Sequence, residues 1–92
     1  MPQIFRIGSY IIYFWSNEND PLEAIHVHVC EGAASANATK VWITFSGKAL
    51  LANNNSRIPD RTLRNLLRFI EANSEHIKKE WYEHFGELRF YC

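Results

Sequence analysis

Residues 25–30, Ile-His-Val-His-Val-Cys, alternate aliphatic side chains with histidine or cysteine at a period of two. This alternation predicts a β-strand, because successive side chains of a strand point to opposite faces of its sheet. The three aliphatic side chains face the predicted core, and His26, His28 and Cys30 share the other face. Same-face neighbours on a strand lie roughly 6.6–7 Å apart, so the two imidazoles can act together. This pair is the main chemical feature of the sequence.

Two β-favouring runs precede this strand and predict a hairpin. Ile4–Ile7 and Tyr10–Trp15 are separated by Gly8-Ser9, a spacer that suits a type II′ turn because glycine accepts a positive φ. Both faces of the second run are largely apolar. We therefore expect it to be covered on both sides, by helices or by another subunit.

A second hairpin is predicted after the histidine strand. Lys40–Phe45 and Lys48–Ala52 are joined by a turn at Ser46-Gly47. We interpret the following Asn53–Ser56 as a plain loop, since asparagine and serine favour turns. Pro59 suits the first turn of a helix, because its missing N–H would have no partner there.

The hydrophobic period changes from two to 3.6 at Asp60, which predicts that helices follow the strands. The apolar residues at helical spacing are Leu63, Leu66, Leu67, Ile70, Ile77, Trp81 and Phe85. Asn73-Ser74 interrupts this stripe, so we predict two helices, the first ended by Asn73 and the second capped by Ser74. Gly86 ends the second helix. Alternation in Glu87–Cys92 predicts a short final edge strand.

This order of elements predicts an α+β fold. We expect a mainly antiparallel sheet of about five strands, followed by two C-terminal helices packed on one of its faces. Residues 1–92 are interpreted as a single domain, because a chain of this length supports one core and no change of composition marks a second.

The composition excludes several classes of function. Lys plus Arg number 10, as do Asp plus Glu, so no global field draws the chain to nucleic acid or to an anionic membrane. Zero net charge also removes repulsion between copies, which favours self-association. Two cysteines, Cys30 and Cys92, are too few for a disulfide framework and indicate a cytoplasmic protein. The apolar run Tyr10–Trp15 is far shorter than the roughly 20 residues that span a bilayer, so we expect no membrane segment.

The histidine pair supports two chemical interpretations. Zinc needs three or four ligands, and Glu31, His84 or Cys92 could join only through tertiary contacts, so we assign no metal and no cofactor. As general acid and base, His26 and His28 would be the catalytic residues of a nuclease or a metal-assisted hydrolase. The alternative is that the two rings only line a sheet surface that faces solvent or a partner.

Four arginines predict a contact with phosphate or RNA. Arg57, Arg61, Arg64 and Arg68 recur at spacings of four, three and four. The last three form one exposed stripe on the first predicted helix, and a row of guanidinium groups suits a phosphate backbone. The alternative is an ordinary solvated helix face.

The N-terminal motif and the histidine strand together resemble a known family. Pro2-x-Ile4-Phe5-Arg6-Ile7-Gly8-x-Tyr10 and His26-Val27-His28-Val29 are similar to a family of small bacterial proteins classed as a domain of unknown function. That family often has proline directly before the first histidine, where this chain has Ala24-Ile25. The resemblance implies a partner, because such proteins are often encoded beside another small domain in pairs that look like toxin–antitoxin modules.

Two functions are therefore expected. The first is a cytoplasmic protein- or RNA-binding component of a toxin–antitoxin-like module, with a protein partner or a second copy as the main expectation and RNA as the alternative. The second is an enzyme that uses His26 and His28. Neither expectation includes a membrane.

Overall fold

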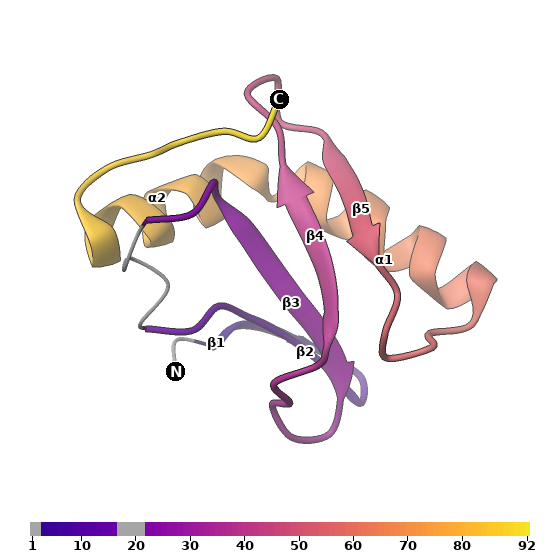
Figure 1. Cartoon of the computed structure of the whole chain (residues 1–92). Coiled ribbons are helices and arrows are strands. Elements are labelled where there is room, and N and C mark those ends of the chain that lie inside the picture. Colours follow the sequence, from indigo (N-terminus) through magenta and orange to yellow (C-terminus); the bar gives the residue numbers. More distant parts are fainter. Residues whose placement is uncertain (1–2, 17–21) are drawn as a thin grey trace.

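The computed structural model describes residues 3–16 and 22–92 and confirms the α+β fold (Figure 1). Five strands form one antiparallel sheet in the order β1-β2-β3-β4-β5, and two helices follow. The elements are β1 (Gln3–Ile7), β2 (Tyr10–Tyr13), β3 (His26–Glu31), β4 (Thr39–Ile43), β5 (Ala49–Asn53), α1 (Asp60–Ala72) and α2 (Ser74–Phe85). Of the two helices in the described part of the chain, neither is long and apolar enough to cross a membrane.

Both predicted hairpins are present. Ile7 pairs with Tyr10 across a turn in which Gly8 has a φ of 59°, a left-handed conformation that glycine adopts without steric cost. In the second hairpin Gly47 has a φ of 88°, and its N–H donates to the carbonyl of Thr44. Each glycine reverses the chain directly, so consecutive strands become neighbours in the sheet.

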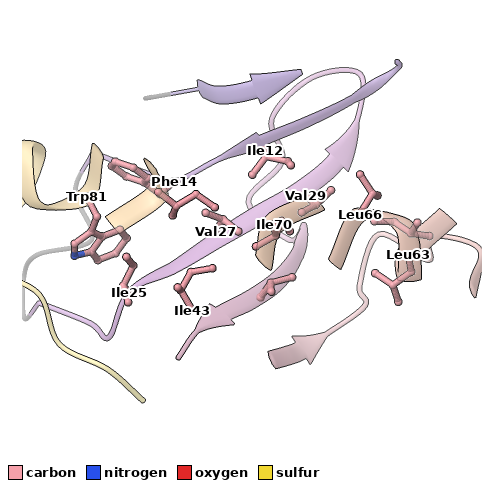
Figure 2. Close-up of a cluster of buried hydrophobic side chains, with 13 residues drawn as sticks. Ile12, Phe14, Ile25, Val27, Val29, Ile43, Leu63, Leu66, Ile70 and Trp81 are labelled. Atoms are coloured by element: carbon pink, nitrogen blue, oxygen red, sulfur yellow. The ribbon is translucent and has the colours of Figure 1, made fainter. Parts of the chain in front are cut away.

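The helices cover one face of the sheet and enclose the main core (Figure 2). Trp81 of α2 is fully buried, with its ring centroid 5.0 Å from that of Phe14 and 4.5 Å from that of Phe85. The strands contribute aliphatic side chains to the same cluster. They are Ile12, Val27, Val29, Val41 and Ile43, and Ile25 joins the cluster from the position directly before β3.

The helix boundary follows the prediction, but its capping does not. α1 ends at Ala72, and α2 runs from Ser74 to Phe85. Gly86 follows α2 in the left-handed conformation, and its N–H donates to the carbonyl of Tyr82. The prediction that Ser74 caps α2 is wrong, because Ser74 is the first helical residue and its side chain makes no capping bond. Instead the Asn73 side chain donates to the carbonyl of Phe69 and closes α1.

The predicted final edge strand is also wrong. The segment after Gly86 is irregular and makes two separate main-chain bonds, from Ile25 N–H to the Arg89 oxygen at 2.8 Å and from Phe45 N–H to the Cys92 oxygen at 2.9 Å. It therefore crosses the ends of β3 and β4 rather than pairing along one strand, as the yellow trace of Figure 1 shows. Leu88 and Phe90 set this path because they pack against the main core.

Candidate functional site

The register of β3 places the histidine pair on the face opposite Val27 and Val29, as predicted, and the His26 ring at the start of the strand also reaches Trp81 of α2. Val27 and Val29 lie in the helix-side core, whereas Cys30 belongs to a second buried cluster with Ile11 and Tyr13. In the register of β3 with β4, His26 lies opposite Trp42, and His28 lies opposite Lys40. Directly opposite residues share a face, so these four side chains project from one side of the sheet.

Both histidines are buried. His26 is 1% exposed and His28 is 9% exposed, with their ring centroids 5.0 Å apart. The His26 ring also lies 5.6 Å from Trp42 and 5.3 Å from Trp81. Its Nδ1 lies 2.9 Å from the carbonyl oxygen of Ala24, and because a carbonyl only accepts, this nitrogen donates. The pair is thus built into a packed aromatic cluster.

A loop closes part of the sheet face beside His28. The ring centroids of Tyr13 and His28 lie 5.6 Å apart, and the Tyr13 hydroxyl donates to the carbonyl of Ser35 at 2.8 Å. The N–H of Ser35 donates back to the same hydroxyl at 3.1 Å. The Cys30 thiol donates to the carbonyl of Ala33. The segment after β3 therefore folds over the β2–β3 half of this face.

The residues that could extend the pair into a metal site do not gather around it. Among the described residues, no group of three His, Cys, Asp or Glu side chains is arranged to hold a metal ion. Cys92 is exposed in the C-terminal segment, and His84 packs against Phe14 and Phe85 on the helix side. Catalysis by His26 and His28 stays a prediction, and the structure places both rings away from bulk solvent.

The β4–β5 half of the same sheet face is open. Trp42 lies opposite Leu50 in the register, and Leu50 is 41% exposed. Tyr91 stacks on Trp42 with ring centroids 4.8 Å apart and an angle of 4°, and it is 63% exposed. The Lys40 ammonium lies 4.2 Å from the centre of the Trp42 ring. We call Trp42, Leu50 and Tyr91 the open sheet face.

The predicted arginines are exposed, and three of them form a row. Arg61, Arg64 and Arg68 lie on the outer side of α1, and we call them the arginine row. Arg64 pairs with Asp60 at 3.3 Å, and Arg68 donates to the side-chain oxygen of Asn65 at 3.4 Å. Arg57 precedes the helix in a left-handed conformation with a φ of 54°, so it is a loop residue and not part of the row.

A groove that was not predicted lies between the β1–β2 turn and α1. Its volume is about 450 Å³, and we call it the turn groove. Its walls are Ile7, Gly8, Ser9 and Tyr10 from the hairpin, and Thr62, Asn65, Leu66 and Phe69 from α1. Helical spacing alone places Thr62 and Asn65 beside the apolar stripe, but only the tertiary structure brings the turn over them.

The chain matches a known protein family. A family described as "Domain of unknown function (DUF4160)" matches residues 9–82, which include four of the five strands, all of α1 and most of α2. No curated protein and no solved structure matches the chain.

Proposed function

The chain belongs to the family described as Domain of unknown function (DUF4160), and we propose that it is a protein-binding component of a pair of small proteins, of the toxin–antitoxin kind. The observation that carries this proposal is the open sheet face, where Leu50 and Tyr91 are exposed beside Trp42. The partner we propose is the small protein encoded next to this one, as the resemblance of the sequence suggests.

The composition of the open sheet face favours a protein partner. Exposed aromatic side chains that can be fully desolvated supply much of the binding energy at protein interfaces. Tyr91 is held by its stack on Trp42, so little side-chain freedom remains to be lost when a partner buries it. Leu50 lies across the β4–β5 ladder from Trp42 and extends the apolar surface to the edge of the sheet.

Side chains of both charges lie at the border of the open sheet face. Lys40 lies over Trp42 and forms an ion pair of 3.1 Å with Glu23. A protein interface commonly has an apolar centre and a charged border of this kind. The chain has zero net charge, so a partner is selected by local contacts and not by long-range attraction.

Co-purification with the product of the adjacent gene, followed by calorimetry, tests the proposal. We expect a stable complex with the wild-type chain and a loss of at least about tenfold in affinity for the double variant Leu50→Lys/Tyr91→Ser, because both changes remove apolar contact area. Tyr82→Ser is the matched control. Tyr82 is 55% exposed but lies on α2, so its loss should leave the affinity within about twofold.

The proposal is overturned by the absence of a complex, by an affinity that the double variant does not lower, or by an equal loss caused by Tyr82→Ser. A homodimer that uses Leu50 and Tyr91 and binds no second protein also overturns it, because the open sheet face would then serve self-association.

A further inference from the structure

The turn groove and the arginine row together indicate a second binding surface, separate from the open sheet face. We infer that the protein binds single-stranded RNA there, with one base in the turn groove and the adjoining phosphates on Arg61 and Arg68. This inference does not depend on the proposed protein partner.

The turn groove has the shape and chemistry that a base requires. Its volume of about 450 Å³ lies within the range of about 300–1,000 Å³ that is typical of small-ligand pockets. Tyr10 and Phe69 line the groove and are only partly buried, so the groove has aromatic residues on which a base can stack. Thr62 and Asn65 add polar groups, which suit the hydrogen-bonding edge of an unpaired base.

The arginine row lies directly beside the groove. Asn65, which lines the groove, follows Arg61 by four residues and precedes Arg68 by three, so the three side chains are neighbours on one helix surface. The bond from Arg68 to the Asn65 oxygen shows this contact. A base in the groove would therefore bring its own phosphate within reach of a guanidinium group.

Two of these guanidinium groups are available to a phosphate. Arg64 is partly neutralised by Asp60 at 3.3 Å. Within residues 3–16 and 22–92, no carboxylate lies within 4.0 Å of Arg61 or Arg68. Arginine binds phosphate well because its planar group offers several donors, and such contacts depend strongly on salt.

The length of the arginine row favours a polynucleotide as the ligand, and the Glu31 carboxylate favours a path of its phosphate backbone along α1. From Arg61 to Arg68 the helix rises about 10 Å, at 1.5 Å per residue, which is enough to meet more than one phosphate. At the turn, the Ser9 hydroxyl donates to the Glu31 carboxylate at 2.6 Å. That negative charge disfavours phosphate beside the turn, so the backbone should follow α1. Bases of a duplex stay stacked inside it, so the groove requires a single strand.

Fluorescence anisotropy with a labelled single-stranded RNA of mixed sequence tests the arginines. We expect Arg61→Ala/Arg68→Ala to lower the affinity at least about tenfold and to reduce the slope of log K against log salt by about 1.4, since each phosphate contact on a single strand contributes about 0.7. Lys48→Ala/Lys79→Ala is the matched control, because both lysines are exposed and the same charge is removed elsewhere. It should change the affinity less than about twofold.

An abasic strand of the same length tests the groove. It keeps the phosphates but offers no base, so we expect binding about tenfold weaker than to the complete RNA. Equal affinity for the two strands overturns the assignment of a base to the turn groove. Equal losses of affinity in the two double variants overturn the assignment of phosphates to the arginine row. No binding at low salt, tighter binding to duplex RNA, or tighter binding to single-stranded DNA of the same sequence overturns the assignment to single-stranded RNA. Circular dichroism confirms that each variant is folded.

Discussion

Replacement of His26 by alanine separates a structural role of the histidine pair from a catalytic one. The ring is 1% exposed and is in contact with the rings of His28, Trp42 and Trp81. Truncation of a buried side chain of this size removes its contacts and leaves a cavity, which costs about 2–4 kcal/mol in comparable core sites. In a domain of 92 residues each kcal/mol lowers Tm by about 4–8 °C, so we expect a decrease of at least about 8 °C.

Thermal unfolding, monitored by circular dichroism, measures this decrease in Tm, and His76→Ala is the control. His76 is exposed on α2 and lies 3.5 Å from Glu80, so its replacement should cost less than about 1 kcal/mol. A His26→Ala protein whose Tm stays within about 2 °C of the wild type would refute the reasoning. If that stable protein also lost a nuclease or hydrolase activity, the enzymatic alternative would replace the packing role.

Two further predictions concern the core and the turn beside it. Gly47→Ala should destabilise the fold more than Gly8→Ala, as measured by urea unfolding. A Cβ at Gly47 would meet the Ser74 hydroxyl at 2.9 Å, whereas a Cβ at Gly8 would enter open space. At Gly8 the only cost is that of the positive φ, about 1–2 kcal/mol. Adding Ser74→Ala should recover part of the difference, and no recovery would refute the clash. Trp81→Phe should lower the free energy of unfolding by less than about 2 kcal/mol, because the buried Nε1 has no hydrogen-bond acceptor among the described residues. This loss is well below the value of about 3–5 kcal/mol that is typical of a Trp→Ala change in a core. A larger loss of unfolding free energy would contradict this expectation.

Local periodicity was sufficient to predict the five strands, the two helices and their order. The alternation in residues 25–30 fixes which side chains face the helices, and the change of period at Asp60 marks the start of α1. The path after Gly86 could not be predicted in this way. Leu88 and Phe90 alternate as in a strand, yet the core positions them so that the segment crosses two strand ends. Tertiary packing therefore overrode the local pattern.

The face of the histidine pair was predictable, but its burial was not. Small residues between β3 and β4 give no hydrophobic signal, and only their hydrogen bonds to the Tyr13 hydroxyl show that this loop covers the sheet. The turn groove was unpredictable for a similar reason. Gly8-Ser9 and Asn65 are far apart in the sequence and meet only because the sheet places the first hairpin next to α1. Sequence patterns identify faces, whereas cavities arise from the contacts between elements.

The two proposed binding surfaces lie at opposite ends of the sheet. The turn groove is at the end where Ser9 bonds to Glu31, the last residue of β3. The open sheet face is at the other end, because Trp42 pairs with His26, the first residue of β3. A protein seated on Tyr91 therefore leaves the arginine row accessible. The affinity for RNA and the affinity for the protein partner should then respond to different substitutions, so one proposal can fail while the other holds.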